Sequence, residues 1–271
     1  EEAWVNYQAS DEFNIKAGLL IPRFNRMNEI KNRMPLIPYI TRPLIFEPTL
    51  KSVINPGRFL PERAFLQIYG KFNLQNVVLD YAAYVGNSET SYANTMPGEV
   101  EETGSDTVNF KMFGGRIGLT YGPISIGFSS TFDKANFQKT PAAAPLKEDV
   151  NRFRYGFDLS FNYYNFFIDG EYIGVSLSPD NTTVDLNKNF FYGTLGYNFT
   201  DEIYAYASYS RMEDQETQHF RAGLDGIIAG AGYRPIPSLV LKAEFCTYYS
   251  KSDYNFPVPG VGVIPVSIDL D

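Results

Sequence analysis

Apolar and polar residues alternate with a period of two along much of this chain. The clearest stretch is 152–164, where the apolar set is Phe153, Tyr155, Phe157, Leu159, Phe161 and Tyr163, with polar or small residues at the positions between. Successive side chains of a β-strand point to opposite faces, so this spacing places the whole set on one face, whereas a helix would scatter it. The stretch therefore predicts a strand with one apolar face and one polar face.

Other stretches repeat this pattern, and together they predict about twelve strands. The pattern is clear at 77–86, 124–132, 191–199 and 239–246, and weaker at 3–9, 13–21, 63–72, 110–121, 166–177, 203–211 and 220–233. The chain also has no apolar run near the ~20 residues that a membrane-spanning helix needs, which excludes a helical membrane protein.

The connections between these stretches alternate between two lengths. The short ones are 10–12, 73–76, 122–123, 164–165, 200–202 and 234–237, and the long ones are 22–62, 87–108, 133–151, 178–189 and 212–219. Short turns at one end and long loops at the other are typical of outer-membrane barrels, and Greek-key crossings give no reason for such regularity. We therefore predict an all-β fold, a transmembrane antiparallel up-and-down β-barrel that forms a single domain over residues 1–271.

The aromatic content agrees with a barrel. The chain has 22 Phe, 20 Tyr and 1 Trp, yet its mean hydropathy is -0.23. A soluble protein would need a large core to bury these rings, whereas lipid solvates the apolar face of a barrel. We expect aromatics near strand ends to form interfacial girdles; these are Tyr7, Phe13, Phe72, Tyr121, Phe132, Phe153, Tyr163 and Phe199.

The N-terminal third resembles a known family. It begins with Glu2-Ala3-Trp4-Val5-Asn6-Tyr7, a polar turn and Asn14-Ile15-Lys16-Ala17-Gly18. Leu20-Ile21-Pro22-Arg23-Phe24-Asn25 follows, and Arg42-Pro43-Leu44 comes later. This succession is similar to the opening of outer-membrane porins of the phosphate-selective type. The resemblance implies a water-filled channel in the bacterial outer membrane, often trimeric, narrowed by an inward-folded loop. Such barrels commonly have sixteen strands, so this chain is expected to be either part of a 16-stranded barrel or a smaller relative.

The long connection 22–62 is the expected constriction loop. Residues 22–63 hold eight basic and three acidic side chains, a net charge of +5 in a chain whose net charge is -8. Arginines in a lumen would concentrate anions. The candidate residues for the pore and for anion selectivity are Arg23, Arg26, Arg33, Arg42, Arg58, Arg63, Lys71, Arg116 and Arg154.

The loop has other interpretations. Its basic residues could instead contact neighbouring subunits or the phosphates of lipopolysaccharide. Alternatively, its arginines could pair with acidic side chains in the lumen, and the candidate acids are Asp80, Asp158, Asp169 and Glu171. The alternation assigns a mixed set of further charged side chains to the lumen, and these include Lys16, Asp225, Lys242 and Glu244. A mixed set predicts a hydrated lumen rather than a conduit for hydrophobic ligands.

Other classes of function fit the sequence poorly. The net charge of -8 argues against a non-specific nucleic-acid binder, and the single cysteine, Cys246, excludes an intrachain disulfide or a thiolate metal cluster. His219 is the only histidine, with Asp214 and Glu216 nearby, and no Gly-x-Ser-x-Gly motif is present. We expect no enzymatic activity, no catalytic residue, no metal and no cofactor.

These observations predict a porin for passive diffusion of small hydrophilic solutes, either a general porin or one with a weak preference for anions. The expected partners are membrane lipid, lipopolysaccharide, the solutes themselves and two further copies in a homotrimer. Two alternatives remain. One is a plugged structural or adhesive barrel that binds partners through its long loops, and the other is a soluble, aromatic-rich, carbohydrate-binding β-sandwich.

Overall fold

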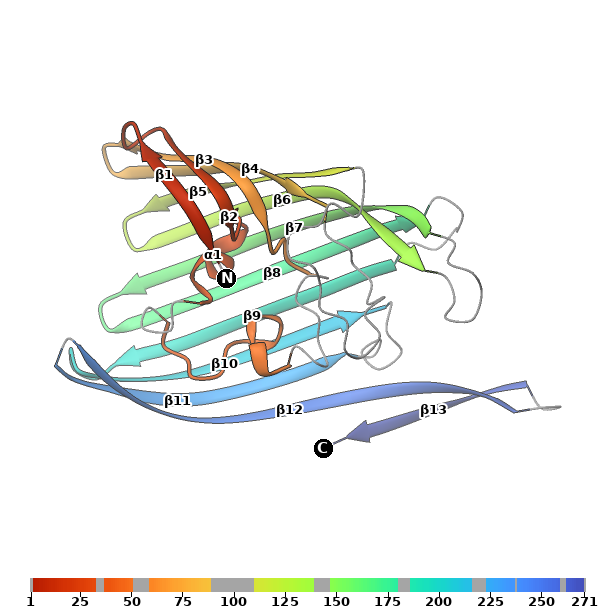
Figure 1. Ribbon diagram of the computed structural model, residues 1–271. Coiled ribbons are helices and arrows are strands. Elements are labelled where there is room, and N and C mark those ends of the chain that lie inside the picture. Colours follow the sequence, from red (N-terminus) through yellow and green to blue (C-terminus); the bar gives the residue numbers. More distant parts are fainter. Residues whose placement is uncertain are drawn as a thin grey trace. The chain divides into compact units, whose positions relative to one another are not determined.

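In a computed structural model, the chain forms one sheet of thirteen strands whose order follows the sequence from β1 to β13 (Figure 1). Every strand pair with a described register is antiparallel. The structure describes residues 2–32, 37–50, 59–88, 110–138, 147–179, 186–215, 223–236, 238–258 and 262–270. The predicted up-and-down barrel topology is therefore confirmed.

The strands have unequal lengths. β1 and β2 have 6 and 7 residues, whereas β7 has 17 and β12 has 20. The bounds are β1 Ala3–Gln8, β2 Asn14–Leu20, β3 Ala64–Leu74, β4 Val77–Asn87, β5 Lys111–Tyr121, β6 Ile124–Gln138, β7 Lys147–Tyr163, β8 Phe166–Pro179, β9 Leu186–Asn198, β10 Ile203–Asp214, β11 Leu224–Ile236, β12 Leu239–Val258 and β13 Gly262–Leu270.

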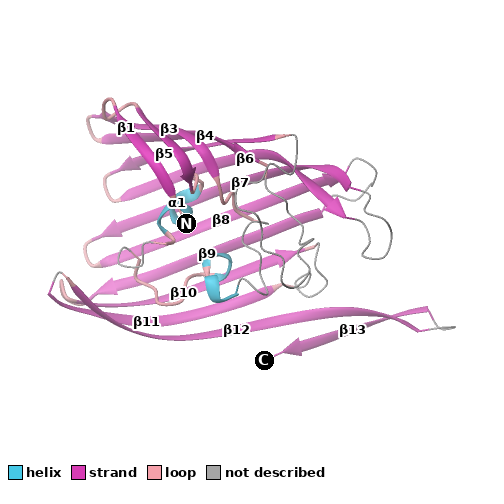
Figure 2. Cartoon of the chain, viewed as in Figure 1, coloured by secondary structure: helices cyan, strands magenta, loops and turns pink. Residues whose placement is uncertain are grey.

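The helical elements described lie between β2 and β3 (Figure 2). They are short: α1 spans Asn25–Ile30, and two 3-10 turns, η2 and η3, span Leu44–Phe46 and Pro48–Leu50. Among the described residues, no helix is both long and apolar enough to cross a membrane.

Internal contacts divide the chain into two compact units. The first contains residues 1–29, 56–158 and 175–186, and the second contains residues 30–55, 159–174 and 187–271. Each unit is described separately below.

The two faces of each strand differ as the alternation predicts. In β7, Phe153, Phe157 and Leu159 are 44%, 51% and 45% exposed, while the intervening Arg152 and Arg154 are fully buried. We call the face with the buried side chains the inner face and the other the outer face. All eight aromatics proposed for the girdles are exposed. The outer face is thus a continuous apolar surface, as expected for strands solvated by lipid.

On the inner face, aromatic rings lie over glycines of neighbouring strands. A Cβ atom on Gly114 would collide with the ring of Tyr84, and one on Gly232 would collide with the ring of Tyr204. The same holds for Gly230 under Tyr206 and Gly196 under Phe167. These rings lie along the wall because the glycines leave room for them.

Several strands extend further than the sequence predicted. β6 ends at Gln138 and β7 begins at Lys147, so most of the predicted link 133–151 is strand. A thirteenth strand, β13, occupies the proline-rich end of the chain, which the alternation had not assigned. The strands extend past the residues that show the apolar alternation, because hydrogen bonds between backbone groups form whether or not one face of the strand is apolar.

The prediction that Asp225 faces the lumen is wrong. Asp225 pairs in register with Arg211, and it shares a face with Ile227, which is 43% exposed, while Ile228 is buried. The stretch 220–233 consists largely of glycine and alanine, so its sequence carries a weak signal for which face is apolar.

Two short turns share the same local chemistry. The Ser10 hydroxyl accepts the backbone N–H groups of Glu12 and Phe13, each at 3.2 Å. The Thr200 hydroxyl does the same for Glu202 and Ile203, at 3.2 and 3.0 Å. Each hydroxyl thus stabilises a Ser/Thr-Asp-Glu turn by accepting hydrogen bonds from two backbone N–H groups of that turn.

Replacing either hydroxyl residue with alanine should destabilise the fold. We expect Ser10→Ala and Thr200→Ala each to lower the free energy of unfolding by about 1 kcal/mol, because two N–H groups lose their acceptor. Urea titration of detergent-folded protein, followed by the fluorescence of Trp4, measures this. Ser10→Thr and Thr200→Ser are the matched controls and should stay near wild type; equal losses in the controls and in the alanine variants would contradict the assignment.

Candidate functional site

In the first unit, the start of the long connection lies against the inner face of the sheet. The Arg23 N–H donates to Gln67 Oε1 on β3 at 2.9 Å, and the Asn25 N–H donates to Ser129 Oγ on β6 at 2.8 Å. Asn28 donates from its side-chain amide to the Pro22 and Pro61 carbonyls at 3.0 and 3.1 Å. Phe24 is fully buried. This part of the connection therefore lies along the wall.

In the second unit, residues 37–50 lie against the inner face of β9–β12. The Tyr39 hydroxyl bonds Thr194 Oγ1 at 2.6 Å, and Thr194 donates to Ser208 Oγ at 2.9 Å. Phe46 packs edge-on against Phe190 and Tyr192, with ring centroids 5.8 and 6.1 Å apart. We call the described parts of this connection, residues 22–32, 37–50 and 59–62, the inner segment.

Arg116 links two of the predicted lumen acids. Its guanidinium reaches Asp80 Oδ1 at 2.5 Å and binds Asp158 in bidentate fashion at 2.7 and 3.0 Å. Arg23 Nη1 lies 3.9 Å from the same Asp80 oxygen. Arg116 and Asp158 are 7% and 6% exposed. Two acids thus share one buried arginine, which offsets part of their negative charge within the wall.

A second cluster is more deeply buried. Asp133 accepts from Arg152 Nε at 2.8 Å and from Arg154 Nη1 at 3.3 Å, and a second Arg152 nitrogen, Nη2, also bonds the carboxylate. All three residues are 0% exposed. The cations on β7 therefore depend on a carboxylate from β6, because an uncompensated buried charge is costly.

Glu29, in α1, ties the inner segment to β2. It accepts from Arg23 Nε at 2.8 Å and from Lys16 Nζ at 3.4 Å, and the Lys16 ammonium also lies over the Trp4 and Tyr69 rings at 4.9 and 5.2 Å. Burial alone would raise the pKa of Glu29, but the charges and hydrogen bonds of Arg23 and Lys16 outweigh it and hold the pKa below its ordinary value. Glu29 is thus held as a carboxylate.

The other predicted site residues are spread over different environments. Arg26 and Lys71 are exposed; Arg63 and Asp169 are half-buried, Glu171 is buried, and Arg42 donates to the Phe46 carbonyl at 3.3 Å. Arg33 and Arg58 lie outside the described residues. The structure therefore gathers Arg23, Arg116, Asp80 and Asp158 in one cluster but places Arg154 in another.

Sequence reasoning missed some of the charged side chains that matter here. Asp133 and Arg152 complete the buried cluster, and Lys188 Nζ binds Asp214 Oδ1 at 2.9 Å on the inner face of β9 and β10. Arg152 lies on the polar face of the predicted strand 152–164, so the alternation was an available signal for it. Asp133, Lys188 and Asp214 lie in connections that were predicted to be loops, and the alternation gave no signal there. Asp214 has Lys188 as a partner, and His219 lies outside the described residues. In the described part of the chain, no three His, Cys, Asp or Glu side chains are grouped to hold a metal ion.

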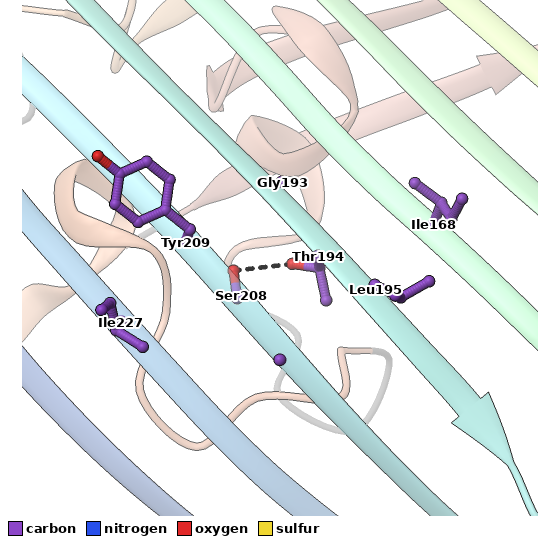
Figure 3. Close-up of a pocket in the computed structure, with 8 residues that line it drawn as sticks. Ile168, Gly193, Thr194, Leu195, Ser208, Tyr209 and Ile227 are labelled. Atoms are coloured by element: carbon purple, nitrogen blue, oxygen red, sulfur yellow. Dashed lines mark hydrogen bonds between the residues drawn. The ribbon is translucent and has the colours of Figure 1, made fainter.

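The outer face carries one feature of its own. A depression of about 490 Å³ lies over β8–β11, where Gly193 and Ala207 leave space between Leu195, Tyr209 and Ile227 (Figure 3). Gly193 has open space where a Cβ atom would stand. Because this surface is apolar and faces away from the charged clusters, it is not a site for hydrophilic solutes.

Solved structures with the same fold are bacterial outer-membrane proteins. The anion-selective porin from Comamonas acidovorans aligns with a TM-score of 0.60 at 11% identity, over 99% of this chain and 73% of that one. OmpT of Vibrio cholerae, in its trimer form, gives 0.54 at 11% identity over 100% and 86%. The outer-membrane channel DcaP of Acinetobacter baumannii gives 0.52 at 11% identity over 88% and 66%.

The sequence itself matches no family model and no curated protein. The structural likeness, at these low identities, is one of fold. The predicted fold, an antiparallel up-and-down β-barrel like that of outer-membrane porins, is confirmed.

Neutralising Asp133 should be strongly destabilising. Asp133→Asn keeps the shape but leaves Arg152 and Arg154 without their shared carboxylate, and we expect a loss of about 3–5 kcal/mol in the free energy of unfolding. Urea titration in detergent measures it. The exposed turn substitution Asp201→Asn is the control, and a loss for Asp133→Asn no larger than the control's would show that the cluster is not structural.

Glu29 should make stability depend on pH. Its folded pKa lies below the unfolded value of about 4.3, so its contribution is fully present above about pH 4.3 and is lost as the pH falls through the folded pKa. We expect wild type to exceed Glu29→Gln in stability at neutral pH, with the difference shrinking only below about pH 4.3. Urea midpoints of both proteins between neutral and acidic pH test this; a difference that shrank well above that pH would contradict it.

Proposed function

We propose that this protein is an outer-membrane porin through which small hydrophilic solutes diffuse passively. The observation that carries the proposal is the contrast between the two faces of one sheet. The outer face exposes large apolar side chains, while the inner face carries charged and hydroxyl side chains, among them Arg116, Asp158, Thr194 and Ser208. A wall of this kind separates lipid from a polar interior, which a porin fills with water.

We further propose that any anion preference comes from the inner segment rather than from the buried cations of the wall. The wall cations Arg116, Arg152 and Arg154 are buried and compensated by Asp80, Asp158 and Asp133. Arg26 on α1 is exposed. An exposed charge lies in the water through which ions pass, whereas a buried ion pair is separated from that water and contributes little field.

A plugged barrel is the second candidate, and one observation favours it. The inner segment buries apolar side chains on the wall in both units: Phe24 in the first, and Leu44, Ile45 and Phe46 in the second, are at most 3% exposed. If the rest of the connection fills the lumen, the protein would serve as a structural or adhesive barrel. A soluble carbohydrate-binding sandwich buries one face of each sheet and exposes a polar face to water, so the exposed apolar side chains of the outer face argue against it. The proposal includes no catalytic step, metal or cofactor.

The proposed assembly is a homotrimer that contacts lipid and lipopolysaccharide with its outer face. Two features support it: the OmpT structure of like fold was obtained in a trimer form, and β1 and β2 are short for a wall facing lipid. A strand that spans the membrane needs about 9–11 residues. The outer face of β1 and β2 is therefore better suited to contact another protein surface than to contact lipid alone.

Conductance in a planar bilayer separates the open and plugged candidates. Folded, inserted wild-type protein should give stable current steps. Cys246 adds an internal reporter, because it is the single cysteine of the chain, is exposed, and shares the inner face with Glu244. A charged, membrane-impermeant thiosulfonate reagent should reduce the current, and Cys246→Ser should abolish that effect. Absence of steps would favour the plugged barrel.

Arg26 should set the sign of the selectivity. Under a salt gradient, we expect Arg26→Ala to lower the anion-to-cation permeability ratio severalfold and Arg26→Glu to lower it further, because a fixed charge in the aqueous path changes local ion concentrations. Arg26→Lys keeps the charge and should retain the wild-type reversal potential. An unchanged potential in Arg26→Glu would exclude Arg26 as the determinant.

A further inference from the structure

Two charged side chains on β12 hold the inner segment by its main chain. Glu244 accepts the N–H of Ile40 through Oε2 at 2.9 Å and the N–H of Thr41 through Oε1 at 2.7 Å. Lys242 donates from Nζ to the carbonyls of Ile37 and Tyr39, at 2.7 and 3.1 Å. The carboxylate thus binds donors and the ammonium binds acceptors of one short stretch, residues 37–41, which we call the strap.

The wall around Glu244 fixes its orientation. The Tyr206 hydroxyl also donates to Glu244 Oε2, and the Tyr206 ring meets Tyr39 edge-on with centroids 5.4 Å apart. Glu244 therefore receives donors from β10 and from the strap together. Hydrogen bonds to an ionised group are about twice as strong as neutral ones, so this carboxylate is a strong attachment point.

The strap is followed by an anchor of a different kind. Leu44 and Ile45 are fully buried, and Phe46 packs against Phe190 and Tyr192. This anchor is apolar and does not involve Lys242 or Glu244. Tyr39 is also held on the wall, because its side chain is buried and its hydroxyl bonds Thr194. Loss of the two charged groups would consequently free Ile40 and Thr41, while Tyr39 and η2 stay on the wall.

The strap presents a side chain away from the wall. Ile40 is 44% exposed, although its N–H is bound to Glu244. Because the bonds from Lys242 and Glu244 end on main-chain atoms, they place the strap independently of the side chains at positions 40 and 41. The distance of Ile40 from the wall is therefore set by the two β12 residues.

We propose that Lys242 and Glu244 are specificity-determining residues of the channel: by holding the strap flat on β12, they keep the aqueous path open and fix the largest solute that passes. This rests on the proposed porin function. They are positioning residues, because they act through the strap rather than on the solute. When Glu244 no longer holds their N–H groups, Ile40 and Thr41 move into the path, and this lowers both the mean current and the size limit.

Two measurements on detergent-folded, full-length protein test the proposal. The first is hydrogen exchange at Ile40 and Thr41, which should become about tenfold faster in Glu244→Gln, because the amide offers these two N–H groups one uncharged acceptor oxygen in place of the two oxygens of a carboxylate. The second is single-channel current with polyethylene glycols of graded size. Lys242→Met and Glu244→Gln should show flickering, reduced current and a smaller polymer cut-off.

The control variants make use of the fact that Lys242 and Glu244 bind main-chain atoms of the strap. Lys242→Arg keeps a cationic donor and should restore the wild-type cut-off. Thr41→Ala keeps the N–H and should behave as wild type, whereas Thr41→Pro removes it and should resemble Glu244→Gln. Unchanged stability in urea alongside a changed cut-off distinguishes positioning from a general loss of structure.

The outcomes separate this proposal from the porin assignment. Current steps in wild type, with a cut-off that is identical in Lys242→Met and Glu244→Gln, would overturn the present proposal alone. Unchanged exchange at Ile40 and Thr41 in Glu244→Gln would also overturn it. A silent wild-type protein would overturn the porin assignment and, with it, solute selection by the strap.

Discussion

The constraint on which this structure depends is that backbone N–H and C=O groups cannot remain unpaired within hydrocarbon. Each strand must therefore be bonded along its length to its neighbours, and an antiparallel ladder that follows chain order achieves this with the shortest connections. The alternation of side chains is a consequence, since a fully paired strand has one face for lipid and one for the interior. Phe157 and Asp158 are adjacent in the sequence and lie in opposite environments for this reason, the first 51% exposed and the second 6% exposed.

The polar face then needs its own solution. The inner face carries the cations Arg116, Arg152 and Arg154, which would be costly to bury under the inner segment without acidic partners. In the structure, each of them pairs with an acid on an adjacent strand or on the next strand beyond it. The inner segment follows the same rule, with Glu29 between Arg23 and Lys16 and Glu244 under the strap. The buried charges of the wall are thus mainly structural, whereas Arg26 of the inner segment and Lys71 of β3 meet water.

Sequence reasoning recovered the features that depend on local period. The strand at 152–164, the short turns at 122–123 and 164–165 and the outward aromatics were all predictable, because they need only the alternation and the turn residues. The charged clusters were predictable as a set of inward residues but not as pairs. Arg116 meets Asp158 across 42 residues, and Ile40 meets Glu244 across 204, so these pairings depend on register over many strands. Asp225 was misplaced where glycine and alanine left the two faces alike, and β13 was missed because prolines obscured its pattern.

The glycines under Tyr84, Tyr204, Tyr206 and Phe167 have an evolutionary consequence. Each ring lies along the wall only while its neighbour lacks a Cβ atom, so exchanging one glycine for alanine would tilt a ring toward the interior without disturbing the backbone ladder. The bore of such a barrel is therefore open to adjustment by single mutations at positions that contact no solute. A lineage in this way gains access to a graded series of pore widths while the strand pairing, on which folding depends, stays unchanged.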